Sequence, residues 1–173
     1  MDATLERQFL DHSAKKLRQY TERIESCLDK LNGEQVWARG GENENAVGNL
    51  VLHLCGNVRQ WIVSGVGGQP DGRERAIEFS TRGGISVPQL VKALRETTEA
   101  ALEALAGVSH SRLSEHLVIQ HYEVSVLEAI YHVVEHFSMH TGQIMLLTKM
   151  HTGADLGFYA HLNTPDPHAQ KTP

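Results

Sequence analysis

The apolar residues of this chain recur at steps of three and four over four long stretches, which is the period of an α-helix with one buried face. These stretches cover residues 4–31, 46–64, 87–106 and 125–150, and a glycine follows each of them within three residues. Four helices of this length can bury their apolar faces against one another. The pattern therefore predicts an all-α protein, a four-helix bundle.

The connections between the predicted helices are longer than a simple hairpin bundle needs. Residues 65–85 are rich in glycine and carry several charges, so we expect a long ordered loop. Residues 113–122 have β-leaning apolar content without a helical stripe, which favours a short extended segment. Asn45, Ser86 and Ser125 are candidates for the N-caps of the last three helices. Connections of this length can carry crossovers or line a site.

The length of 173 residues fits one domain with an ample core. We expect a single helical bundle over residues 1–163. Residues 164–173 contain three prolines and are expected to form a flexible C-terminal tail.

Charge and composition disfavour several classes of function. The chain has 16 Lys and Arg against 21 Asp and Glu, a net charge of −5, whereas a generic binder of nucleic acid or anionic membrane is basic. No apolar run approaches the roughly 18 to 20 residues of a membrane span, and the start of the chain does not read as a signal peptide. Cys27 and Cys55 fit neither a disulfide framework nor a zinc motif, so we interpret them as small core residues. We expect a cytoplasmic protein with no nucleic-acid or membrane partner.

Three of the eleven histidines recur at a spacing of four in the last predicted helix. They are His132, His136 and His140, and this spacing places successive rings one turn apart on the same side of the helix. On a helical wheel His140 lies within the apolar arc, His136 at its margin and His132 towards the polar side. Two imidazoles at this spacing can bind one divalent metal, although the spacing alone also fits half-buried structural histidines.

A third metal ligand would have to come from another helix. His53 is the histidine of the second predicted helix, at the edge of its apolar arc, and Asn49, Asn57 and Gln60 lie within about 40° of it on the wheel. A histidine beside three amides suits a polar pocket better than a packed core. The alternative is a structural histidine held by hydrogen bonds.

Other polar side chains are candidates for roles around this site. Those that could orient the histidine rings are Asn49, Asn57, Glu135 and Gln143, with Gln143 closest in angle to His136. His132 could be a fourth ligand, an acid–base residue beside the metal or a residue of the rim. Arg59 and Arg73 could meet an anionic substrate, although Arg59 also fits the helix surface.

These motifs resemble the DinB-like (YfiT-type) superfamily of metal-binding four-helix proteins, and within it an uncharacterised bacterial subfamily. The resemblance is carried by residues 124–149, residues 49–61 and the loop from Gly65 to Phe79, which contains Pro70-Asp71-Gly-Arg73 and Glu78-Phe79. It covers nearly all of residues 5–163 and the order of the elements.

The resemblance implies a bundle of DinB/YfiT-like topology in which His53, His136 and His140 hold a divalent metal. It also implies a homodimer. Some relatives transfer low-molecular-weight thiols such as bacillithiol, mycothiol or glutathione, or act as isomerases, and others are regarded as metal-dependent hydrolases. Many thiol transferases of the superfamily carry His-His-Arg-Gly-Gln where this chain has Met139-His140-Thr141-Gly142-Gln143, so the extra histidine and the arginine are missing.

Three neutral imidazoles leave a divalent metal with open positions, where water is acidified or a carbonyl or thiol binds. Imidazole suits zinc, nickel, copper and iron, so the sequence does not choose the metal, and zinc or nickel is the expectation. One hypothesis is therefore a metal-dependent enzyme, a hydrolase or thiol S-transferase, acting on a small molecule such as a low-molecular-weight thiol. The alternatives are a non-catalytic metal-binding or sensing bundle and a plain interaction module.

Overall fold

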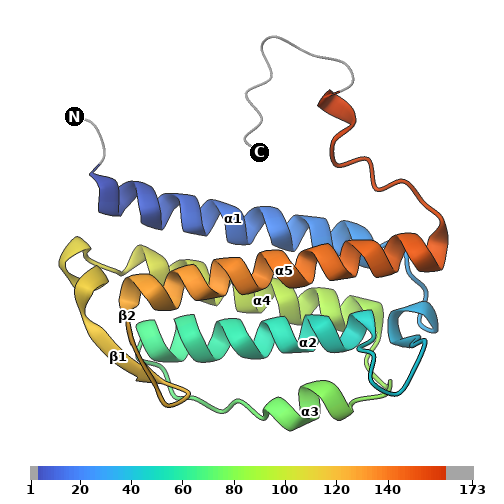
Figure 1. The fold of residues 1–173 in the computed structure, drawn as a ribbon, viewed down its shortest axis with the longest axis horizontal. Coiled ribbons are helices and arrows are strands. Elements are labelled where there is room, and N and C mark those ends of the chain that lie inside the picture. The colour runs from blue at the N-terminus through green and yellow to red at the C-terminus, as the bar shows by residue number, and fades with distance from the viewer. Residues whose placement is uncertain (1–3, 163–173) are drawn as a thin grey trace.

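Four long helices lie side by side along the longest axis of the molecule in the computed structural model, which describes residues 4–162 (Figure 1). The α-helices are α1 (Leu5–Leu28), α2 (Val47–Val58), α3 (Arg75–Ser80), α4 (Val87–Ala106) and α5 (Val126–Thr152). Short 3₁₀ turns cover η1 (Gln35–Trp37), η3 (His110–Ser114) and η4 (Ala160–Leu162). A π-helical segment, η2 (Arg59–Val66), continues α2, and two strands, β1 (His116–Ile119) and β2 (Tyr122–Ser125), pair with each other. The predicted all-α bundle with long connections is confirmed.

The core lies between the four long helices, where α1 packs on α4 and α5, and α2 packs on the same two helices. It is built from the apolar stripes that the periodicity indicates; its fully buried side chains include Leu17, Ile24, Leu54, Leu94, Ile130, Phe137 and Ile144. Cys27 and Cys55 are both buried, and burial raises the pKa of each thiol, that of Cys55 to about 11. The two cysteines are small core residues, as expected.

The helix boundaries follow local capping chemistry in most places. At the start of α5, Ser125 Oγ accepts from Glu128 N at 3.2 Å, and Ser125 N donates to Glu128 Oε2 at 2.7 Å. Ser86 N donates to Gln89 Oε1 at 2.8 Å before α4. The prediction that Asn45 caps α2 is wrong, because the N-cap is Ala46, whose backbone N–H donates to the Asn49 side chain. A side chain inside the helix thus satisfies a backbone donor at this helix start.

The two long connections contain more structure than the sequence indicates. The α3 connection, residues 67–86, leads from η2 to α4, and its short helix α3 packs against α2 (Figure 1). Of the extended segment expected over 113–122, residues 116–119 form strand β1 of an antiparallel hairpin, with His116 opposite Ser125 and Ile119 opposite Tyr122, whereas residues 113 and 114 belong to η3. The α3 connection thus reaches the helix that bears His53.

None of the helices between residues 4 and 162 is long and apolar enough to cross a membrane. The predicted tail, residues 164–173, lies outside the described residues.

Candidate metal centre

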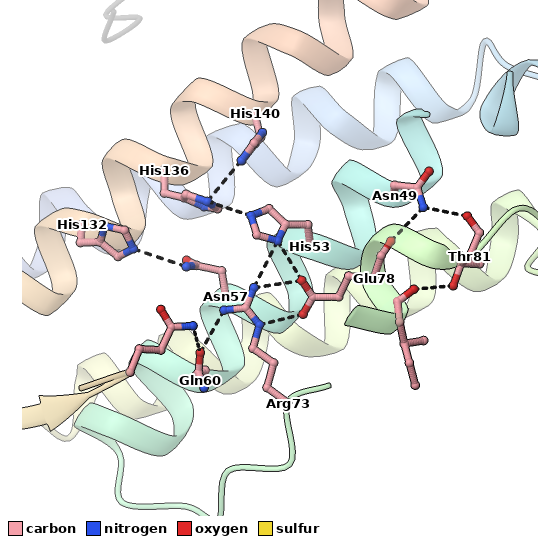
Figure 2. A network of polar contacts seen from close by, with 12 residues as sticks. Asn49, His53, Asn57, Gln60, Arg73, Glu78, Thr81, His132, His136 and His140 are labelled. Atoms are coloured by element: carbon pink, nitrogen blue, oxygen red, sulfur yellow. Dashed lines mark hydrogen bonds and ion pairs between the residues drawn. The ribbon is translucent and has the colours of Figure 1, made fainter. Parts of the chain in front are cut away.

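Three of the predicted site residues meet between α2 and α5. His53 lies on α2, and His136 and His140 lie one turn apart on α5 (Figure 2). The Nε2 atom of His136 is 3.0 Å from Nε2 of His53 and 3.2 Å from Nε2 of His140. One ring nitrogen from each histidine lies within 4.8 Å of the other two. The structure therefore brings the three predicted ligands to one point.

Two of the three rings have their other nitrogen committed to an acceptor. His53 Nδ1 is 2.8 Å from Glu78 Oε2, and His140 Nδ1 is 2.7 Å from Gln143 Oε1. Both partners are oxygens that accept, so each Nδ1 carries a proton and each Nε2 of a neutral ring is a bare lone pair. His53 and His140 thus present two acceptors to the same point.

The third ring cannot satisfy this arrangement by itself. If the neutral His136 carries its proton on Nε2, its Nδ1 is a buried acceptor without a partner among the described residues. If the proton is on Nδ1, three Nε2 lone pairs converge with no donor between them. A cation among the three nitrogens removes the clash of lone pairs and fixes the His136 proton on Nδ1, which is then a buried donor without a partner among the described residues. Nitrogens about 2.0–2.1 Å from one tetrahedral zinc are about 3.3 Å apart, close to the two shorter separations here.

The surroundings of His136 and His140 favour their neutral forms. Burial lowers the pKa of His136 to about 3, and the neighbouring His140 and His53 contribute to this decrease. Burial also lowers the pKa of His140, although the hydrogen bond to Gln143 opposes this. Neutral imidazole is the form that binds a metal, so His136 and His140 do not need to lose a proton to bind one at neutral pH.

The partner of His53 is a buried carboxylate. Glu78, on α3, also forms an ion pair with Arg73, with 2.7 Å between Arg73 Nε and Glu78 Oε1. Burial alone would raise the pKa of Glu78, but the hydrogen bonds from Arg73 and His53 outweigh it and lower the pKa below its usual value. Glu78 is therefore ionised at neutral pH.

The sequence motifs contain Glu78 and Arg73, but nothing in their pattern indicates these roles. Glu78 lies 25 residues from His53 in the chain, in a connection expected to be a loop. The suggestion that Arg73 meets an anionic substrate does not fit, since its side chain is only 3% exposed and its charge is paired. A buried Glu–Arg pair in a glycine-rich connection becomes visible only when the connection is folded.

His132 lies beside the three-histidine cluster but outside it. Its ring packs on Trp61 at 4.3 Å between centroids, and its Nε2 is 3.4 Å from Asn57 Nδ2. Its ring centroid is 5.5 Å from that of His136, and burial lowers its pKa. The structure thus places His132 against α2 next to the cluster, with a polar contact of its own.

The other predicted supporting residues divide between the cluster and its surroundings. Gln143 contacts a cluster histidine, but this is His140 rather than His136. Asn49 donates instead to the backbone carbonyls of Glu78 and Thr81, at 2.8 and 2.9 Å. Helical-wheel angles place such residues on the correct face of a helix, but their hydrogen-bond partners depend on the neighbouring elements. Of the remaining candidates, Glu135 is exposed, and Arg59 donates to Thr97 Oγ1.

Comparisons with known proteins agree with this architecture. The profile of the family described as Protein of unknown function (DUF1572) matches residues 4–162. The crystal structure of the conserved protein of a locus from Enterococcus faecalis matches with a TM-score of 0.71 at 15% identity, covering 83% of this chain and 97% of that chain. The crystal structure of a DinB-like protein from Bacillus cereus ATCC 10987 matches with a TM-score of 0.62 at 20% identity, covering 76% of this chain and 85% of that chain. No curated protein matches the sequence. The DinB-like fold expected from the sequence is confirmed.

Proposed function

We propose a metal-binding function for this chain, which belongs to the family described as Protein of unknown function (DUF1572). One divalent transition-metal ion would bind to the Nε2 atoms of His53, His136 and His140. The observation that carries this proposal is the convergence of three ring nitrogens while two of the rings have Nδ1 bound to Glu78 or Gln143. Imidazole nitrogens suit zinc, nickel, copper and iron, and of these we expect zinc or nickel.

The donor set supports an open rather than a closed site. Three protein nitrogens leave at least one position of a tetrahedral ion for water or a small molecule. His136 and His140 are only half-buried, so the cluster is not sealed from solvent. The three imidazoles are neutral ligands and the Glu78 charge is balanced by Arg73, so the positive charge of the ion would remain available to polarise what binds there.

These features support a metal-dependent enzyme acting on a small molecule, either a hydrolase or a thiol S-transferase. When bound, the metal would acidify water or a thiol at the open position. Thr141 stands where many thiol transferases of the DinB-like superfamily have arginine, so hydrolysis is the reaction to assay first. From the same resemblance we propose that the protein is a cytoplasmic homodimer. Light scattering of the purified protein would test the oligomeric state.

Metal analysis after chelation and reconstitution tests the binding proposal. We expect close to one zinc or nickel ion per chain. His53→Ala, His136→Ala and His140→Ala should each lower occupancy, whereas His116→Ala, at an exposed position of strand β1, should not. Absence of stoichiometric metal from the reconstituted wild type would reject metal binding, and equal occupancy in all four variants would reject these ligands. Metal binding without turnover of esters, amides or thiol acceptors would favour a sensing or structural role.

A further inference from the structure

Glu78 is buried next to the proposed metal ligand His53. Its side chain is 8% exposed, and one of its oxygens, Oε2, lies 2.8 Å from His53 Nδ1. Arg73 holds the same carboxylate through two donors, Nε to Oε1 at 2.7 Å and Nη2 to Oε2 at 2.9 Å (Figure 2). The carboxylate therefore accepts from the guanidinium and from the imidazole at once.

The proton between His53 and Glu78 belongs to the ring. Arg73 Nη2 also lies 3.2 Å from His53 Nδ1. A guanidinium nitrogen only donates, so it cannot accept a proton from the ring, and this one already donates to Glu78 Oε2 at 2.9 Å. A bare Nδ1 would place a lone pair 2.8 Å from an ionised carboxylate, which repels it. Nδ1–H therefore donates to Glu78, and Nε2 of the neutral ring is directed at His136 as a lone pair.

A glycine on α2 leaves room for this carboxylate. A Cβ at Gly56 would lie 1.9 Å from Glu78 Oε1 and 2.8 Å from the carboxyl carbon. Any side chain at this position would displace the carboxylate from His53 and Arg73. Gly142, on α5 between His140 and Gln143, is different, because a Cβ there meets nothing within 4 Å. Of these two glycines, only the one beside Glu78 is thus required by packing against a neighbouring side chain of the site.

The α3 connection is attached to α2 and its continuation η2 on both sides of His53. On one side Asn49 Nδ2 donates to the backbone carbonyls of Glu78 and Thr81. On the other side Arg73 Nη1 donates to Gln60 Oε1 at 3.0 Å. Because Glu78 sits between these attachments, its position depends on the folding of the whole connection.

We propose that Glu78 is a positioning residue for the metal ligand His53, and that through it the α3 connection and the metal site stabilise each other. This inference rests on the proposed metal-binding function. Glu78 fixes the tautomer and orientation of the ring and makes Nε2 a better donor to the metal. Coupling of this kind is reciprocal, so bound metal tightens the α3 connection by the same factor by which the connection raises metal affinity.

Zinc affinity measured against a competing chelator tests the first part of the proposal. We expect Glu78→Gln and Gly56→Ala to weaken binding about 10- to 100-fold, the usual effect of losing such a partner. Gly142→Ala is the matched control, a helical glycine close to a ligand, and should leave affinity unchanged. The visible spectrum of the cobalt(II) form should change in Glu78→Gln and Gly56→Ala and stay as in the wild type in Gly142→Ala.

A variant without unpaired charge keeps the test valid if single substitutions unfold the protein. Arg73→Met combined with Glu78→Leu removes both members of the buried pair, which proteins often tolerate. We expect this variant to fold and to bind zinc about 100-fold more weakly than the wild type. Hydrogen exchange of residues 75–80 should slow on zinc binding in the wild type. The same zinc-dependent slowing should be smaller in Glu78→Gln.

The outcomes separate this inference from the function on which it rests. If the wild type binds no metal, the proposed function fails and the role of Glu78 falls with it. If the wild type binds zinc and the folded Glu78 variants bind it within about threefold, with unchanged cobalt spectra, only the positioning role is overturned. Loss of stability with retained affinity would also overturn the positioning role, because a purely structural ion pair predicts that result.

Discussion

The two helices that supply the histidines support them in different ways. On α5, His140 is held by Gln143, three residues further along the same helix, in an exposed hydrogen bond. On α2, His53 is held by Glu78 of α3. The Glu78 side chain is buried and forms an ion pair with Arg73, which precedes α3 in the same connection. The α5 half of the site depends on local helix geometry, whereas the α2 half depends on a long connection folded back onto the bundle. The comparison indicates that damage to the connection should disturb the site more than damage to the α5 support.

The largest expected effect is on stability, from Arg73→Ala. This change leaves the buried Glu78 carboxylate without its cation, which should lower the free energy of unfolding by about 3–5 kcal/mol. Gln143→Ala, on the exposed α5 side, should lower it by less than about 1 kcal/mol. Urea unfolding of the metal-free proteins measures both, and similar losses in the two variants would remove the distinction between the halves.

The next effect concerns pH and His136 of α5, whose Nε2 lies near those of both His53 and His140 and whose Nδ1 has no partner among the described residues. Its pKa is about 3 in the fold and about 6.5 in the unfolded chain, so the unfolded state binds the proton first as pH falls. Stability of the metal-free protein is then fully present above about pH 6.5 and is lost towards pH 3, by up to about 1.4 kcal/mol per pH unit for one proton.

Urea unfolding of the chelator-treated protein at several pH values between about 4 and 7 measures this loss. His136→Gln removes the titrating ring and should give a flatter dependence. A slope identical to that of the wild type would show that other groups carry the acid sensitivity.

A smaller effect is expected on metal affinity from Gln143→Ala. Water can replace an exposed amide oxygen at His140 Nδ1, so the lost hydrogen bond is worth about 0.5 kcal/mol, or two- to threefold in zinc affinity. Competition with a chelator measures it beside Glu78→Gln. A loss as large as that in the Glu78 variant would mean that local and tertiary support contribute equally.

The smallest effect is expected from His132→Ala. His132 packs on Trp61 and lies outside the three converging nitrogens, so zinc affinity should stay within about twofold of the wild type. Any loss should instead be in stability, from the packing lost on Trp61. Zinc affinity lowered by more than about tenfold would make His132 part of the metal site and would extend the α5 half by one turn.

The parts of the fold that the sequence predicts well are those with local causes. The expected helix over residues 87–106 coincides with α4, because the apolar period and the Ser86 cap lie within the segment itself. The α3 helix cannot be predicted in this way, because six residues are too few to show a helical period. Wheel angle places Asn49 near His53, yet Asn49 holds the backbone after α3, since its partner is chosen by a neighbouring element.

The four helices and the pair His136 and His140 follow from the sequence alone, because periodicity, capping and histidine spacing are properties of neighbouring residues. His53 joins this pair as a candidate ligand through its place on the helical wheel and through the resemblance to DinB-like proteins. The surroundings of these rings depend instead on the tertiary structure. Glu78 reaches His53 because the α3 connection folds back on α2 and Gly56 leaves space for the carboxylate. Contacts of this kind join residues far apart in the chain, and the path of the connection, which no local pattern records, brings them together.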